Sequence, residues 1–272
     1  MPLSTVSDTE VPDMSTHHPA ATSGSTQRMH LGAGTNGAPA ELAAWRDHTR
    51  VFLQPIAAPS ILGLFGFSAA TFIVTAYLVG WYGTAASPLL IFPFAVAAGG
   101  IFQGIAAIWS YRARDGLATA VHGIWAAFWL GWGFLQFMIA LKLIPAPARG
   151  AAIPALGYWF FMLAAITGAA MFASLAENLS LTMVLLPLSV GSAFLGIFYM
   201  VGGSFWIHLG GYVTMLSACT AFYAAFAMMM ADTTGRVILP VGMLRKDANV
   251  PGRRPNYPIQ FELGEPGVRH GQ

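Results

Sequence analysis

Six long apolar stretches, separated by short breaks, are the feature that most restricts what this chain can fold into. They run over Ile61 to Tyr82, Leu89 to Tyr111, Ala118 to Leu141, Ile153 to Phe172, Leu179 to Met200 and His208 to Met230. Each has about 20 residues or more, and a helix of that length spans the hydrocarbon core of a bilayer. No Asp, Glu, Lys or Arg lies in the middle of any stretch. The sequence therefore predicts an all-α membrane protein, a bundle of six transmembrane helices.

The charge content agrees with this class and excludes others. Only 9% of the 272 residues are charged, against about 25% in ordinary soluble domains. The formal net charge of +2 is too small to indicate a nucleic-acid surface, so no nucleic-acid partner is expected. A single cysteine, Cys219, cannot form a disulfide or a cysteine-based metal site within one chain.

The distribution of basic residues predicts the orientation in the membrane, because Lys and Arg are retained on the cytoplasmic side. With both termini in the cytoplasm, eleven of the 13 Lys and Arg lie inside, and only Lys142 and Arg149 lie outside. We predict three parts. Residues 1–54 are a disordered cytoplasmic tail with a short interfacial segment at Trp45 to Leu53, 55–242 are the six-helix transmembrane domain, and 243–272 are a cytoplasmic C-terminal tail.

The motifs of common enzyme classes are absent from the sequence. It contains no HExxH, no GxSxG, no Walker lysine loop and no GxGxxG following a strand. His122 and His208 stand apart, without a partner at metal-binding spacing. We therefore expect no catalytic residues, no metal and no cofactor.

Several polar and aromatic residues within the apolar stretches each allow two interpretations. Pro59 either simply starts a helix or, with the hydroxyl of Ser60, marks a helix N-terminus that binds an anion. Gln103 either bonds a neighbouring helix or contacts substrate. His122 is either an interfacial packing residue or a proton-linked gate.

The same ambiguity holds for one helix face and for the large rings. Ser68, Thr71 and Thr75 share a face of the first helix, where their hydroxyls either line a path or bond back to their own backbone. Trp129, like Phe67 and Trp125, is either a packing ring or part of a pore. After the last stretch, Gly235 to Gly242 reads as a helix stop and basic anchor, with a direct role in transport as the alternative.

Five short motifs in order along the chain resemble one known family. They are Pro59 to Phe67 (PSILGLFGF), Gly99 to Gln103 (GGIFQ), Phe128 to Leu130 (FWL), Tyr223, and Gly235 to Gly242 (GRVILPVG). This set resembles the acetate uptake transporter family, which includes bacterial succinate-acetate permeases and fungal acetate or ammonia-export relatives. The resemblance covers roughly Pro55 to Gly242.

The resemblance implies a hexamer of six-helix protomers, each with its own path for a small carboxylate. It implies a narrow apolar constriction at Phe67 and Trp125, with Leu188 and Ala221 lining the same path. Departures from the family pattern are Ala58 in place of Asn, Ile61 in place of a second Pro, Trp125 in place of Tyr, and Ser110 in place of an acidic residue.

We therefore predict a transporter or channel of the cytoplasmic membrane for acetate or a related small carboxylate, either passive or proton-linked. Ammonia export and acid sensing are the alternatives. The expected partners are the carboxylate, with or without protons, the lipid bilayer and further copies of the chain. The predicted substrate path consists of Pro59, Ser60, Gly63, Phe67, Thr71, Gln103, Trp125, Leu188 and Ala221.

Overall fold

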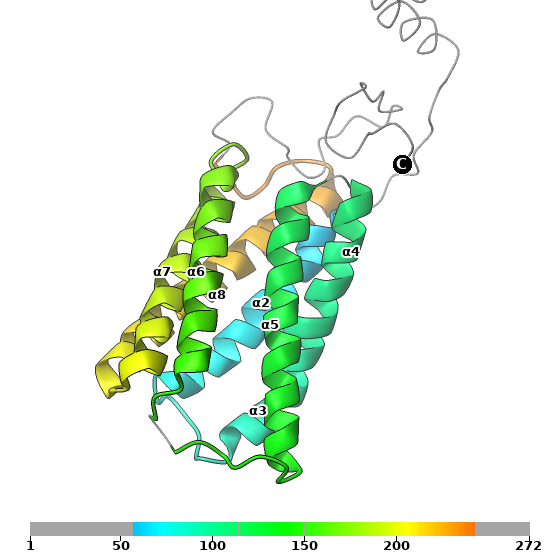
Figure 1. Ribbon diagram of the computed structural model, residues 1–272. Coiled ribbons are helices and arrows are strands. Elements are labelled where there is room, and N and C mark those ends of the chain that lie inside the picture. Colours follow the sequence, from blue (N-terminus) through cyan, green and yellow to red (C-terminus); the bar gives the residue numbers. More distant parts are fainter. Residues whose placement is uncertain (1–56, 114, 149–150, 243–272) are drawn as a thin grey trace, which may run out of the picture. The chain divides into compact units, whose positions relative to one another are not determined.

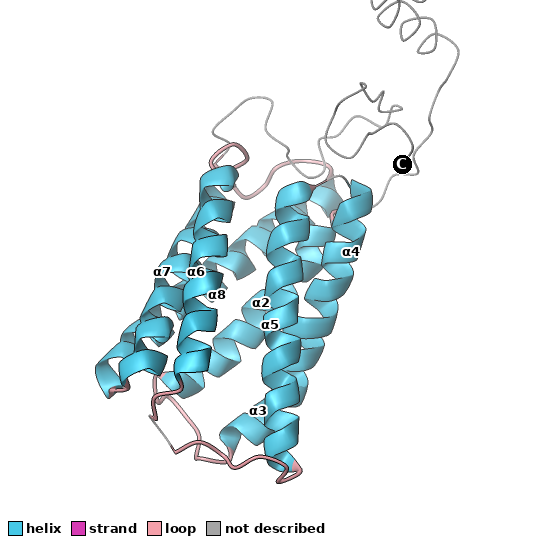
Figure 2. Ribbon diagram, in the orientation of Figure 1, coloured by secondary structure: helices cyan, strands magenta, loops and turns pink. Residues whose placement is uncertain are grey.

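The computed structural model describes residues 57–113, 115–148 and 151–242, and these residues form helices without any strand (Figures 1 and 2). The predicted tails, 1–54 and 243–272, lie entirely outside the described residues. The helices are α2 (Pro59–Leu78), α3 (Ser87–Ala95), η1 (Val96–Phe102), α4 (Gln103–Ala113), α5 (Gly116–Ala140), α6 (Pro154–Ser174), α7 (Leu179–Val201) and α8 (Ser204–Thr234). Since α3, η1 and α4 form one rod over Ser87–Ala113, six rods are long and apolar enough to cross a membrane, which confirms the predicted bundle.

Local residue chemistry explains where the helices begin and end. Pro59 stands in the first turn of α2, where its missing N–H is not needed. The side chains of Asp115 and Asn178 cap α5 and α7 by accepting hydrogen bonds from the backbone N–H of Ala118 and Leu181, both at 2.9 Å. Gly235, at a φ of 69°, ends α8 in the left-handed conformation. The predicted helix stop at Gly235 is confirmed.

Three predicted boundaries were wrong by about a turn. The first crossing ends at Leu78 rather than Tyr82, because Gly80 adopts a φ of 79° and turns the chain. The last crossing is longer than His208 to Met230 and extends over Ser204–Thr234. Polar residues such as Asp232 lie near its ends. Hydropathy therefore underestimates the length of this helix, which continues beyond its apolar part.

The second rod contains a wide turn that the apolar pattern does not reveal. Its central segment, η1, is π-helical, and Pro93 lies just before it inside α3. Gly99 and Gly100, within η1, have no side chain where the rings and branches of Trp129 and Leu130 on α5 approach. Such π turns recur at functional sites in proteins.

The helices pack in a ring-like order, with α2 against α8 and α4, α7 between α6 and α8, and α4 against α5 (Figure 1). Close approach depends on small residues: a side chain at Gly66 would overlap the carbonyl oxygen of Ala98 on η1. In contrast, α5 and α6 follow each other in the chain but contact each other much less than the other neighbours do. The ring is therefore least tightly closed between α5 and α6.

The segment after α8 folds back onto the start of α7. The backbone N–H groups of Leu179 and Ser180 donate to the carbonyl oxygens of Gly242 and Val241, at 2.7 and 2.9 Å. The hydroxyl of Tyr223 donates to the carbonyl oxygen of Pro240 at 2.7 Å. The exit motif thus satisfies N–H groups that a helix start leaves free, which is a structural role.

Candidate functional site

A cavity of about 360 Å³ opens in the half of the bundle that holds the C-terminal ends of α2 and α5. Each of the six rods contributes at least one residue to its wall, and none of the lining residues carries a charge. The lining residues are Thr71, Val74, Thr75, Tyr77, Leu78, Pro88, Trp125, Ala127, Phe128, Trp129, Gly131, Trp132, Leu135, Gln136, Leu156, Trp159, Phe160, Leu195, Tyr199 and Thr214. A mostly apolar cavity with a few polar groups is the usual form of a small-molecule site.

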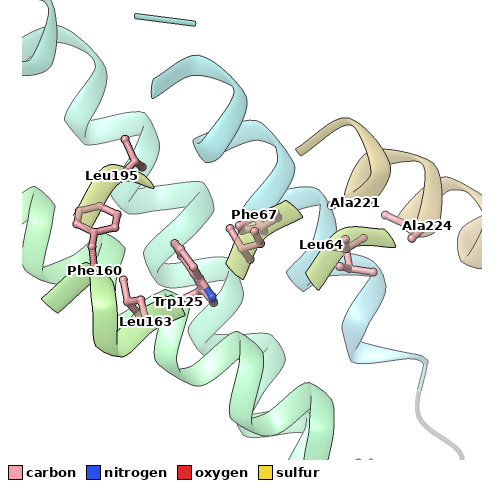
Figure 3. Packing of buried hydrophobic residues seen from close by; sticks show 11 residues of the cluster. Leu64, Phe67, Trp125, Phe160, Leu163, Leu195, Ala221 and Ala224 are labelled. Atoms are coloured by element: carbon pink, nitrogen blue, oxygen red, sulfur yellow. The ribbon is translucent and has the colours of Figure 1, made fainter. Parts of the chain in front are cut away.

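Figure 3 shows a buried cluster of large apolar side chains, of which Trp125, Phe160 and Leu195 also line this cavity. It contains Phe67, Trp125, Leu188 and Ala221, the residues that the family resemblance places at the constriction. The rings of Phe67 and Trp125 meet edge to face, with their centroids 5.8 Å apart. These four residues from α2, α5, α7 and α8 are each at most 3% exposed. We call this group the constriction layer.

One hydrogen bond holds the Trp125 ring in place. Its indole Nε1–H donates to Oγ1 of Thr167 on α6, at 3.1 Å. Thr167 is 1% exposed, and this bond joins α5 to α6, two consecutive helices that contact each other little. Sequence reasoning missed Thr167, because a Thr in an apolar helix can equally bond its own backbone, as Thr75 does.

Thr167→Val is therefore expected to destabilise the bundle by about 1–3 kcal/mol, because it leaves the buried indole N–H without an acceptor at unchanged side-chain volume. Thr167→Ser keeps the hydroxyl and serves as the matched control. Thermal unfolding of the purified protein in detergent measures the difference. Equal melting temperatures for the two variants would show that this bond does not contribute to stability.

A second layer lies one helical turn towards the cavity, at Thr71 on α2 and Trp129 on α5. The Trp129 ring packs with Ala70, the neighbour of Thr71, in a second buried cluster. Oγ1 of Thr71 and Nε1 of Trp129 are buried and have no hydrogen-bond partner among the described residues, and both residues line the cavity. We call this pair the donor layer, since each group has a hydrogen to donate.

The other two hydroxyls on the same face of α2 are already bonded. Oγ1 of Thr75 donates back to the carbonyl oxygen of Thr71 at 2.7 Å. Oγ of Ser68 donates to the carbonyl oxygen of Ala218 on α8 at 2.8 Å. Of the three hydroxyls predicted to share this face, Thr71 alone is without a partner in the part of the chain that the structure describes.

A third layer lies one turn from the constriction in the other direction and contains Gly63, Gln103 and His122. One face of the His122 ring lies against Gly63, where any side chain would overlap it. Nδ1 of His122 is 3.4 Å from Oε1 of Gln103. Nε2 of Gln103 donates to the carbonyl oxygen of Gly99 in η1 at 2.9 Å. Gln103 thus joins neighbouring elements, as its structural interpretation predicts, and we call this group the histidine layer.

The layers follow from helix periodicity. Gly63, Phe67 and Thr71 are spaced by four residues on α2, while His122, Trp125 and Trp129 are spaced by three and four on α5. Since α2 and α5 run in the same direction, equal steps along them keep matching residues level, with layers about 5–6 Å apart. Pro59 and Ser60 continue this column at the first turn of α2, where both are half-buried.

The structure thus arranges the nine predicted path residues as a column rather than as one pocket. Thr71 and Trp125 line the cavity, Phe67, Leu188 and Ala221 complete the constriction layer, and Gly63 and Gln103 belong to the histidine layer. Ser110, which replaces the acidic residue of the family pattern, bonds its own helix through the carbonyl oxygen of Ala106 at 2.8 Å.

Comparison with known proteins places the chain among membrane transport proteins. It is 27% identical over 187 residues to the succinate-acetate/proton symporter SatP of Escherichia coli strain K12, covering 69% of this chain and 96% of the relative. An uncharacterized protein of Methanothermobacter thermautotrophicus is 25% identical over 198 residues, covering 72% of this chain and 96% of that protein.

The fold matches a solved structure of the bacterial acetate channel SatP with a TM-score of 0.63 and 26% sequence identity. The match covers 69% of this chain and 100% of the solved chain. The model of the GPR1/FUN34/yaaH family matches residues 45–246, which include all six rods and the three layers. The resemblance to acetate uptake transporters is confirmed, and the chain belongs to the GPR1/FUN34/yaaH family.

Proposed function

We propose that this chain is a transporter or channel of the cell membrane that moves acetate or a related small carboxylate through the column of three layers. The observation that supports this most is the pair of unpartnered donors, Thr71 and Trp129, in a cavity that ends at the Phe67–Trp125 contact. The relatives named for acetate and succinate support the substrate class.

The donor layer suits a carboxylate that must bind and then leave. Each carboxylate oxygen accepts hydrogen bonds. The hydroxyl of Thr71 and the indole N–H of Trp129 can donate to it without breaking a hydrogen bond to another described residue. No Lys or Arg lines the cavity, so the attraction is weaker than an ion pair would provide. Weak binding favours permeation, because a tightly held ion leaves slowly.

The constriction layer would then select by size. A short acid presents only a small apolar tail to the edge-to-face rings of Phe67 and Trp125. Longer tails would have to displace rings that are packed on all sides and, for Trp125, held by Thr167. Side chains in such a core do not yield without a free-energy penalty.

Thr71→Val and Trp129→Phe each remove one donor and are expected to raise the KM for acetate by about fivefold, the equivalent of one hydrogen bond of roughly 1 kcal/mol. Thr71→Ser keeps the hydroxyl and should retain the wild-type KM. Initial rates of labelled acetate uptake into proteoliposomes give these values. An unchanged KM in both Thr71→Val and Trp129→Phe would show that the donor layer does not bind acetate.

The function itself is tested with purified protein in liposomes and labelled acetate, propionate, butyrate and succinate. Saturable uptake above that of protein-free liposomes, with competition among the short acids, is the expected result. No protein-dependent flux of any of these acids would refute the proposal.

Ammonia export is the second candidate, since a neutral molecule needs only the apolar constriction and no donor layer. Comparing ammonia and acetate flux in the same liposomes separates the two, because Thr71→Val should weaken acetate transport and leave ammonia transport unchanged. An acid sensor would bind acetate without moving it, and would show saturable binding with no flux.

Three further expectations belong to this proposal. Both termini are in the cytoplasm, which the side of protease cleavage of the tails in oriented vesicles would test. Copies of the chain assemble as a hexamer, each with its own path, which mass measurement in detergent would test. Passive and proton-linked transport remain the two modes of action, and the histidine layer bears on them.

A further inference from the structure

We propose that His122 is a proton-binding site that couples the movement of a carboxylate to that of a proton. This inference rests on the proposed carboxylate transport and adds the co-transported ion and the residue that binds it. It starts from the position of the imidazole, which is one turn beyond the constriction layer on the same face of α5 as Trp125 and Trp129.

The hydrogen bonds around Gln103 determine which ring nitrogen of His122 carries the proton in the neutral state. Nε2 of Gln103 donates to the carbonyl oxygen of Gly99, so the amide cannot be reversed without placing two oxygens 2.9 Å apart. The oxygen Oε1 of Gln103 therefore faces Nδ1 of His122. Only a protonated Nδ1 interacts favourably with that oxygen, which makes Nδ1–H the neutral tautomer.

The other nitrogen, Nε2, then has a free lone pair that can accept a proton. Among the described residues, the hydrogen-bond contact of His122 is the one at Nδ1, and Gly63 lies over the face of the ring rather than in the ring plane, where the Nε2 lone pair points. Accepting a proton converts His122 into a cation without moving the ring, because Nδ1–H keeps its contact with Gln103. The proton comes from the solution and leaves to it, and no covalent bond other than N–H changes.

No other charge on the neighbouring helices is placed to compensate this cation. The titratable or charged groups on the elements packed against α5 are Tyr77 near the end of α2, Tyr111 and Arg112 in the last turn of α4, and Tyr158 in the first turn of α6. Asp115 precedes α5 itself, and its carboxylate caps the helix through Ala118. None of these residues has a hydrogen bond to His122.

Among the described residues, no negative charge is placed to neutralise a protonated His122. This couples the binding of a proton to the binding of the carboxylate. A lone imidazolium in an apolar layer is costly, and so is a lone carboxylate passing the constriction. Together they neutralise each other, so each favours the binding of the other by the same free energy. A carboxylate that enters the column is therefore expected to bring a proton onto His122, which amounts to symport.

The test compares the pH dependence of acetate flux in liposomes at equal pH on both sides, after subtraction of the acetic acid leak of protein-free liposomes at each pH. Wild-type flux should fall about tenfold per pH unit on the alkaline side of its midpoint, as the protonated fraction of a single site does. His122→Gln should remove this dependence. His208→Gln, which changes an exposed histidine of α8, is the matched control and should keep the wild-type profile.

A second variant covers the case in which His122→Gln is inactive. Gln103→Leu keeps the imidazole but removes the acceptor of Nδ1–H, and this bond is stronger in the charged state. Its pH midpoint should therefore move to lower pH. Three outcomes would each overturn the proton site while leaving acetate transport intact. They are an unchanged midpoint in Gln103→Leu, the same pH profile in His122→Gln as in the wild type, and wild-type flux that does not depend on pH. Absence of wild-type flux would instead refute the proposed function.

Discussion

Replacing Trp125 with alanine is expected to raise the flux of butyrate relative to acetate on the order of tenfold, because it removes the largest ring of the constriction layer. Trp125 is 2% exposed and meets Phe67 edge to face, so its loss opens the column at the contact between these two rings. Competitive uptake of labelled acetate and butyrate in the same proteoliposomes gives the ratio. Phe67→Ala should act in the same direction.

Two controls separate selectivity from damage to the fold. Trp125→Phe keeps an aromatic ring but loses the bond to Thr167, and should retain most of the preference for acetate. Trp109→Ala removes an exposed tryptophan of α4 and should leave the ratio unchanged. An unaltered butyrate-to-acetate ratio in both Trp125→Ala and Phe67→Ala would exclude these rings from the path.

Gly66→Val is expected to destabilise the protein by about 1–3 kcal/mol, the usual penalty for overpacking. A Cβ at this position would overlap the carbonyl oxygen of Ala98, a backbone atom that cannot rotate away as a side chain would. Relief would require α2 and η1 to move apart, and η1 is the segment that positions Gln103. Thermal unfolding in detergent measures the loss.

Gly131→Ala is the matched control for stability. Gly131 is also within a helix and has no atom within 4 Å of the position that a Cβ would take. This substitution should leave the melting temperature unchanged or raise it slightly, since alanine restricts the unfolded chain. If Gly66→Val melted at the same temperature as Gly131→Ala, close packing of α2 on η1 would not be needed for stability.

The number of crossings could be predicted because the bilayer imposes a minimum length on every helix that spans it. Backbone detail within a crossing could not: the apolar run from Leu89 to Tyr111 is equally compatible with an α-helix and with the π-helical turn at η1. Helix ends were misjudged where polar residues continue a helix, as at Ser204 and Asp232 of α8.

The column was only partly predictable. Phe67, Trp125, Leu188 and Ala221 come from four helices, and the family resemblance, not their spacing, indicated that they meet. Contacts between distant parts of the chain, such as Trp125 with Thr167, leave no local pattern in the sequence. The same holds for Thr71: sequence alone could not show that its hydroxyl is unbonded while that of Thr75 is bonded.

The central claim, that acetate passes through the cavity between the helices, is tested most directly by blocking the cavity chemically. Gln136 lines it near the end of α5, and Cys219 can first be changed to serine to remove the exposed native thiol. In Gln136→Cys, complete modification by a bulky thiol reagent, verified by mass spectrometry, should abolish acetate flux. The same reagent on Phe134→Cys, an exposed position on the same helix, should not. Full modification at position 136 with undiminished acetate flux would contradict the account.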